Sequence, residues 1–318
     1  MHIQNMIMRY RIIQLAFLFS VIFANAGYSQ TKRAINSNAL YFLSDCQQPI
    51  IFEEILLKPY KNIEGRDSLF TDILKHNPES IFLLGDMVSK GSSRKKWTPI
   101  DKFLVSLKER HGKVYPIPGN HEYLVSAGKG MKNYLKRFPA ESLQGYCVRT
   151  DSLAIVMLNS NFKKMTPFQR TRQNKWFLKL MDSLDIDKSV LGIVVCTHHA
   201  PYSNSKVVGS STDVQKEFLP HFINSAKAKL FITGHSHNLE YFKIQDKDFL
   251  VIGGGGGLAQ PLLTGDKQIY KDRVSPDEKP LFFYITLLRS NKTISIYATG
   301  LDRRFDHIST RPIGEIHL

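Results

Sequence analysis

Residues 114–122 read VYPIPGNHE: a short apolar run that predicts a strand is followed directly by Asn120, His121 and Glu122. Four other apolar runs end in the same way, at Asp45, at Asp86, at His198 with His199, and at His235 with His237. In an α/β sheet, ligands bind in the crevice outside the carboxyl ends of the strands. We therefore expect five segments to bring oxygen and nitrogen ligands to one place, which suits a pair of divalent ions.

The rest of the chain alternates apolar runs with amphipathic segments, as an α/β fold requires. The predicted strands are 40–43, 81–84, 114–117, 153–158, 190–196, 230–233, 249–252, 281–288 and 293–298, and the last two form a terminal β-hairpin. Thr98 and Thr166, each followed by proline, predict helix starts, and 213–226 is a third amphipathic candidate. No repeat or long linker interrupts residues 27–318, which we interpret as a single domain.

The composition is that of an ordinary globular protein, with 42% hydrophobic and 22% charged residues among 318. Disorder, collagen and coiled coil are excluded. Three cysteines are too few for a disulfide framework, so Cys46, Cys147 and Cys196 are interpreted as small buried residues. A disulfide between two of them cannot be deduced from the sequence.

The first 26 residues contain Arg9 and Arg11 but no acid, then an apolar run over 12–23 and the small residues of Ala24-Asn25-Ala26. This pattern predicts a cleaved signal peptide and an exported protein, periplasmic or secreted. The alternative is an uncleaved N-terminal anchor. No later stretch is long and apolar enough to span a bilayer, so the mature chain is expected to have no transmembrane segment.

The net charge of +15 indicates an anionic partner, such as a phosphorylated small molecule or polymer. Short basic clusters are scattered along the chain and are typical of solvated loops. The charge would also suit nucleic acid as a partner. However, the sequence has no aromatic stripe suited to stacking bases, so a nuclease is a less favoured hypothesis.

The five segments together resemble the calcineurin-like metallophosphoesterase superfamily. Its Asp-x-His, Gly-Asp, Gly-Asn-His-(Asp/Glu), His-x-Pro and Gly-His-x-His motifs appear in order between Asp45 and His237, with one substitution. The resemblance implies an α/β fold of four layers, an αββα sandwich with two mixed sheets, and a two-metal site. Manganese, iron or zinc would be typical there, and the sequence does not choose among them.

Carried over motif by motif, the resemblance implies that Asp45 and His237 bind the first metal and that Asp86 bridges both. Asn120, His199 and His235 would bind the second metal. Pro201 lies two residues after His199, so the His-x-Pro spacing selects His199 as the ligand. His198 then becomes a core residue or a partner behind the metals, because consecutive side chains point in different directions.

The sequence departs from the family pattern at Gln47, where the first motif has a histidine. An amide oxygen is a weaker donor than imidazole for transition metals, so Gln47 could ligate directly, hold a water, or mark a degenerate site. Purple acid phosphatases also lack that histidine but supply a tyrosine where this chain has Ser89, so their iron-tyrosinate chemistry is not predicted. Ser89 and Lys90 also replace the Asp and Arg of protein phosphatases, and Lys90 keeps a positive charge that could contact phosphate.

The implied reaction is hydrolysis of a phosphate monoester or diester by a hydroxide held between the metals. His121 is the candidate general acid, with Glu122 orienting it, although His121 could instead only position phosphate. Asn204 is a further candidate, either as a substrate contact or as an Asn-x-Ser glycosylation site. The glycines 253–257 lack the spacing of a phosphate loop and predict a tight turn near the site. The alternative function is a degenerate protein that binds an anionic polymer without catalysis.

Overall fold

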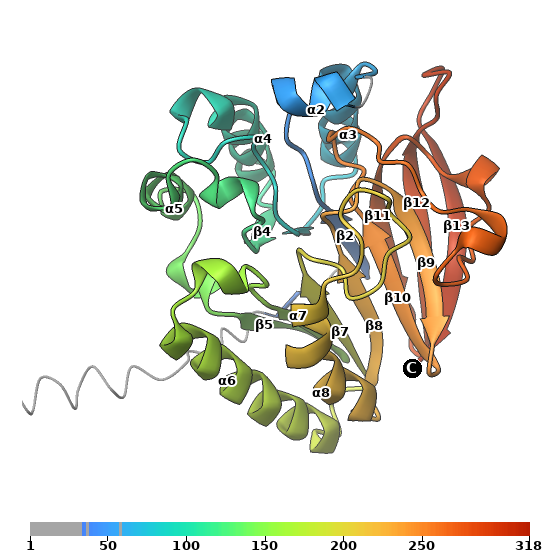
Figure 1. The fold of residues 1–318 in the computed structure, drawn as a ribbon. Coiled ribbons are helices and arrows are strands. Elements are labelled where there is room, and N and C mark those ends of the chain that lie inside the picture. Colours follow the sequence, from blue (N-terminus) through green and yellow to red (C-terminus); the bar gives the residue numbers. More distant parts are fainter. Residues whose placement is uncertain (1–33, 36–37, 57–58) are drawn as a thin grey trace, which may run out of the picture. The chain divides into compact units, whose positions relative to one another are not determined.

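Two mixed β-sheets form the centre of the protein (Figure 1). The computed structural model describes residues 34–35, 38–56 and 59–318, which belong to the unit Lys32–Leu318. The first sheet has the order β1-β5-β6-β7-β8-β10-β9: Ala34–Ile35, Tyr146–Thr150, Leu153–Met157, Gly192–Thr197, Ala228–Thr233, Lys247–Ile252 and Leu239–Ile244. The second has the order β13-β12-β11-β2-β3-β4: Ser309–His317, Thr293–Leu301, Phe282–Arg289, Ala39–Leu43, Ser80–Leu83 and Lys113–Pro116.

The strands that precede the polar motifs run parallel within each sheet. In the second sheet β2 pairs with β3 and β3 with β4, both in parallel. In the first sheet β7 and β8 are parallel neighbours. Parallel neighbours end at the same edge, so the residues that follow them gather there.

Alternating side chains along the strands build two separate apolar layers. From β2 and β3, Leu40, Phe42 and Phe82 enter a core shared with both sheets. Their neighbours Tyr41, Leu43 and Ile81 point the other way, into a second core with residues of the helices α3, α4 and α5. Strands β2 and β3 are therefore buried on both faces, as their near-continuous apolar sequences require.

Helices cover the outer face of each sheet. Against the second sheet lie α3 (Asn62–Lys75), α4 (Thr98–Glu109) and α5 (Ala127–Leu135). Against the first lie α6 (Pro167–Ile186) and α8 (Leu219–Asn224), where Phe177 contacts Phe218 and Phe222 contacts Phe231. The remaining helices are α2 (Ile51–Leu56) and α7 (Thr212–Glu217), with 3-10 turns at Arg94–Trp97, His121–Tyr123, Ala140–Leu143, Phe162–Lys164, Gly265–Lys267 and Pro276–Glu278. This is the expected four-layer αββα arrangement.

The structure corrects several predicted elements. The chain does not finish as a hairpin, because β13 adds a third antiparallel strand beside β12. The helix expected over 213–226 is two short helices that meet at Phe218, just before Pro220. Thr98 is the first residue of α4 rather than its cap. Thr166 does cap α6, in a reciprocal capping box with Gln169.

The signal peptide expected over 1–26 lies outside the described residues. Within the described part of the chain, no helix has the length and apolar character needed to cross a bilayer. Cys46, Cys147 and Cys196 are buried free thiols, as the sequence suggested.

The stacked rings between the sheets should contribute strongly to stability. Phe82 is fully buried and stacks on Phe42 at 4.7 Å and on Tyr115 at 5.1 Å between ring centroids. We expect Phe82→Ala to lower the free energy of unfolding by about 3–5 kcal/mol, measured by urea denaturation, because it leaves a cavity in a closed core. Phe168→Ala is the control, since Phe168 is 72% exposed. Equal losses in the two variants would contradict this assignment of the core.

Candidate metal centre

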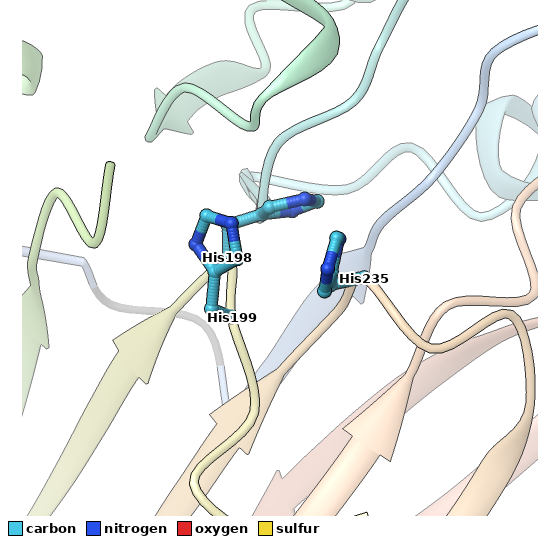
Figure 2. A group of neighbouring side chains, drawn as sticks. All are labelled: His198, His199 and His235. Atoms are coloured by element: carbon cyan, nitrogen blue, oxygen red, sulfur yellow. The ribbon is translucent and has the colours of Figure 1, made fainter. Parts of the chain in front are cut away.

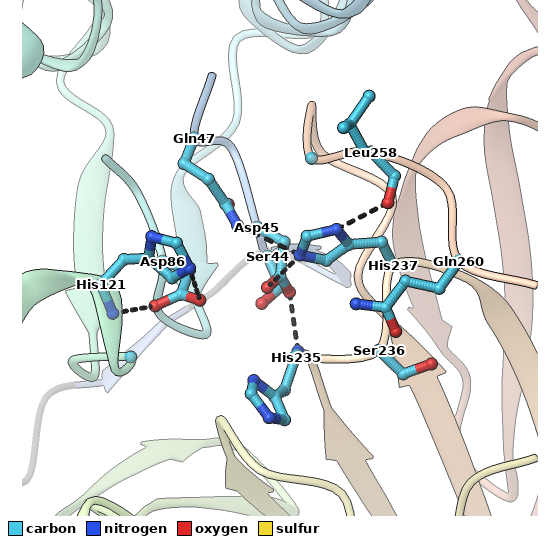
Figure 3. Close-up of polar contacts among 12 residues, drawn as sticks. Ser44, Asp45, Gln47, Asp86, His121, His235, Ser236, His237, Leu258 and Gln260 are labelled. Atoms are coloured by element: carbon cyan, nitrogen blue, oxygen red, sulfur yellow. Dashed lines mark hydrogen bonds and ion pairs between the residues drawn. The ribbon is translucent and has the colours of Figure 1, made fainter. Parts of the chain in front are cut away.

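The predicted site residues follow the ends of β2, β3, β4, β7 and β8, in the turns that leave these strands. Three of them have left-handed backbone conformations, with φ of 59° at Asp45, 48° at Asp86 and 67° at His235. Such conformations are costly for residues other than glycine and persist where the surroundings impose them, commonly at functional sites. Figure 3 shows Asp45, Asp86, His121, His235 and His237 around one centre.

Asp86 lies beside His121 in Figure 3 and is 1% exposed. Its Oδ1 accepts a hydrogen bond from the backbone N–H of His121 at 2.7 Å. Its Oδ2 lies 3.2 Å from Nε2 of His198 and 3.8 Å from Nε2 of His121. A buried carboxylate with several nitrogens around it is suited to bridging cations.

His198 and His199 both face the site, contrary to the expectation that only one would. Figure 2 shows their rings gathered with that of His235, and the ligand nitrogens of the three lie within 4.8 Å of one another. His198 Nδ1 lies 2.9 Å from the carbonyl of Leu84. His198 Nε2 is therefore directed toward Asn120 Oδ1, at 3.1 Å, and toward Asp86.

His199 is held in a different way. Its Nδ1 lies 2.8 Å from the hydroxyl oxygen of Ser160, which also accepts the backbone N–H of His199 at 3.0 Å. Ser160 was not predicted from the sequence. It follows β6 as part of the polar run Asn159-Ser160-Asn161, so the signal that identified the other motifs was present there too.

The second half of the site contains Asp45, Gln47 and His237. His237 Nδ1 lies 2.8 Å from the Leu258 carbonyl, which directs Nε2 toward Gln47 and Asp45. The Gln47 amide donates to the carbonyls of Asp86 and Asp45 when its oxygen faces His237 Nε2 at 3.1 Å. Asp45 Oδ2 accepts the backbone N–H of His235 at 2.9 Å. Asp45 Oδ1 is buried without a hydrogen-bond partner, 3.4 Å from His237 Nε2.

These residues fit a pair of metal ions. Separations of 3.1–3.4 Å between donor atoms are those of neighbouring ligands around an ion bound at about 2.0–2.2 Å. Asp45 Oδ1 has no hydrogen bond, and both it and the Gln47 oxygen face His237 Nε2, so these atoms form a position that favours positive charge. Asp86 belongs to the group with Asp45 and His198, and His198 also belongs to the group with His199 and His235.

The electrostatics keep His199 and His235 neutral and favour positive charge beside the buried carboxylates. Burial, with His198 and Lys163 adding to it, lowers the pKa of His199 to about 3. Burial and His199 likewise hold the pKa of His235 well below its usual range. Burial acts to raise the pKa of Asp86, but His198 and His121 outweigh it and the pKa is lowered. Burial acts to lower the pKa of His198, but Asp86 raises it to about 9. The proton on His198 occupies the place of a cation, and metal binding would release it.

Glu122 fixes the two loops that carry Asp86 and Asn120. It is fully buried and accepts four backbone N–H bonds, from Gly119 at 2.7 Å, Asp86 and Met87 at 2.9 Å and Val88 at 3.4 Å. Burial and the Asp86 charge raise the pKa of Glu122 to about 7, while the N–H donors favour its charged form. Gly119 packs so tightly that a Cβ there would lie 2.1 Å from Asp86 Oδ1.

A cleft of about 380 Å³ opens beside the histidines. Asn120, His199 and His235 line its inner end, and residues 160–164 and 208–213 form its walls. A space of this size holds an organic ligand together with its phosphoryl group.

The remaining predicted residues occupy other places. His121 Nδ1 lies 3.0 Å from the Ser89 carbonyl, which directs its Nε2 toward Asp86. Lys90 is partly exposed in the loop after β3. Asn204 is 1% exposed, and its amide bonds the backbone of Ile269 and Tyr270, so no free group remains for a substrate or a glycan.

Residues 253–257 are a turn that supports the site, as expected. The N–H groups of Gly255 and Gly257 donate to the carbonyls of Ser44 and Asp45, both at 2.9 Å. These donors are therefore used within the protein and do not form a phosphate loop.

Comparison with known proteins gives a family and a fold. The model of the calcineurin-like phosphoesterase family matches residues 39–239, more than half of the chain. No curated protein matches the sequence. A purple acid phosphatase from yellow lupin (Lupinus luteus) seeds superposes with a TM-score of 0.63 at 12% identity, over 87% of this chain and 53% of the lupin chain. This chain thus spans about half the length of that enzyme.

Two further solved structures share the fold. A dimetal phosphatase from Danio rerio has a TM-score of 0.57 at 13% identity, over 87% of this chain and 99% of that one. GAP50, the anchor in the inner membrane complex of Plasmodium, has a TM-score of 0.54 at 14% identity, over 87% and 89% of the two chains. At such identities the likeness establishes the architecture alone.

The role of Glu122 can be tested by Glu122→Gln. The amide keeps the shape but turns a donor toward backbone N–H groups, so we expect a loss of about 1–3 kcal/mol in the free energy of unfolding of the metal-free protein. Urea denaturation measures it. Glu109→Gln, at an exposed position on α4, should change stability by less than about 0.5 kcal/mol. Unchanged stability in Glu122→Gln would show that the two loops do not depend on this carboxylate.

Proposed function

This chain belongs to the calcineurin-like phosphoesterase family, and we propose that it is an exported hydrolase that uses two metal ions to cleave a phosphate monoester or diester. The observation that carries the proposal is the convergence of two groups of ligand atoms, Asp45-Asp86-His198 and His198-His199-His235, on one centre. Export is supported by the signal-peptide pattern of residues 1–26.

The contacts support a revised set of ligands for the second metal. We assign His198 to it, with Asn120, Asp86 and His235, because His198 Nε2 lies 3.1–3.2 Å from Asn120 Oδ1 and Asp86 Oδ2. His199 lines the inner end of the cleft and is anchored by Ser160. Asp45, Gln47 and His237 serve the first metal, and Asp86 is shared.

When bound, two divalent cations supply a water acidified enough to attack phosphorus and neutralise charge on the phosphoryl oxygens. The protein contributes position and proton transfer. Asp86 belongs to one ligand group and contacts His198, which belongs to both, and its oxygens are fixed by the His121 N–H and by His198. Glu122 keeps the Asp86 and Asn120 loops at a constant separation.

We assign His121 as the general acid that protonates the leaving oxygen. Its Nδ1 is turned to the Ser89 carbonyl, so Nε2 is the atom available to a substrate. Burial acts to lower the pKa of His121, but Asp86 and the Ser89 carbonyl outweigh it and the pKa is raised. A general acid must carry its proton at working pH, and this environment favours that state.

Metal-dependent turnover is the direct test of the proposed function. Metal-stripped protein titrated with manganese, zinc or iron should hydrolyse an aryl phosphate monoester or diester, and the preferred ester identifies the class. We expect His235→Ala to reduce turnover at least 100-fold because it removes a metal ligand. Folded protein without turnover with any metal would instead support the degenerate protein that binds an anionic polymer.

The two neighbouring histidines should behave differently when each is replaced. We expect His198→Ala to abolish binding of the second metal ion, and His199→Ala to weaken it only about 10-fold, as loss of a supporting residue does. Isothermal titration with manganese measures both affinities. Loss of the second ion in His199→Ala with full binding in His198→Ala would restore the assignment made from the His-x-Pro spacing.

A further inference from the structure

The cleft beside the metal centre has a basic wall. Lys163 and Lys164 form part of its lining, while His199, His235 and Asn120 close its inner end. We propose that these two lysines select substrates that carry a second anionic group, distant from the phosphoryl group that is cleaved. This inference rests on the proposed function and narrows its substrate class.

The loop of the lysines is fixed relative to the metal centre. Asn161 Nδ2 donates to the Pro118 carbonyl at 2.8 Å, which ties the loop to the turn that carries Asn120. The Lys164 backbone N–H donates to the Asn161 carbonyl at 2.8 Å, and Phe162 is buried against Phe218. The lysines therefore stand at a defined position along the cleft, and the binding of an anion there needs little rearrangement of the loop.

The two charges are available to a ligand. Both lysines are exposed, and neither side chain has an ion pair or hydrogen bond with another described residue. The acid in the lining, Asp213, is paired with Arg170 at 3.4 Å. Arg170 also bonds Glu217 and lies over the Phe162 ring at 4.7 Å, so it is held on the outer side of this loop. The cleft is thus left with two unpaired positive charges.

The polar character of the opposite wall agrees with an anionic or strongly polar ligand. Residues 209–212 there are Gly-Ser-Ser-Thr. Ser211 caps α7 through its hydroxyl, and the Ser210 hydroxyl accepts the Ser203 N–H at 3.1 Å, so this wall is also ordered. A neutral apolar group would leave the lysines without a partner and would gain little from these hydroxyls.

Two matched substrates isolate the contribution of the charge. We would compare the KM values of 4-sulfophenyl phosphate and 4-(methylsulfonyl)phenyl phosphate, which differ in one remote negative charge and in the acidity of the phenol that leaves. The wild-type protein should favour the sulfonate in kcat/KM by about fivefold at low salt, through KM, because exposed charge pairs contribute modestly. The preference should fall as ionic strength rises.

The variants assign the preference to the two lysines. K163Q/K164Q should remove it, so that the two esters no longer differ in KM in this variant. K175Q/K179Q loses the same two charges from exposed positions on α6, outside the cleft lining, and should keep the preference. Equal kcat/KM values for the two esters in the wild-type protein would overturn the inference. The same loss of the sulfonate preference in both double variants would also overturn it. Absence of turnover of these monoesters and of an aryl phosphate diester with any metal would instead count against the proposed function itself.

Discussion

The Asp86 carboxylate is the constraint on which the site depends. It is buried within one group of ligand atoms, and its charge is offset by His198 and His121 and, as proposed, by two cations. A charge this deeply buried persists only when it is paired and hydrogen-bonded. Its left-handed backbone, the bond from the His121 N–H and the clamp by Glu122 all fix where it points. The parallel strand ends of both sheets bring the remaining ligands to it.

The two proposed metal positions differ chemically because of Gln47. The first offers oxygens from Asp45, Gln47 and Asp86 with a single nitrogen from His237, whereas the second adds His198 and His235 to Asn120 and Asp86. Oxygen ligands suit manganese and magnesium, and imidazole suits zinc and iron. We therefore expect a looser, harder first position and a tighter second one. The cleft lined by Lys163 and Lys164 lies beside this second position, so the residues proposed to select the substrate are close to those proposed to bind the second metal ion.

Much of the site could be predicted from the sequence, because polar residues that directly follow buried parallel strands lie together at the carboxyl edge of the sheet. The α/β architecture could also be predicted, from the alternation of apolar runs with amphipathic segments. The orientation of His198 and His199 could not be predicted, since the turn after β7 breaks the alternation of side chains and lets both rings face the site. The strand β13 was missed because its residues are polar and include Pro312. In the sequence, Lys163 and Lys164 do not differ from other surface lysines. Only the fold shows that they line the cleft. Asn204 lies in an Asn-x-Ser motif, but its side chain is buried and its role is structural.

The shared role of Asp86 is tested most directly by counting bound metal. Wild-type protein and Asp86→Asn would each be saturated with manganese, freed of excess, and analysed for metal per chain, with circular dichroism to confirm folding. The account predicts two ions per wild-type chain and at most one, weakly held, in Asp86→Asn, because one carboxylate serves both positions. A folded Asp86→Asn that retains two ions with unchanged affinity would contradict it.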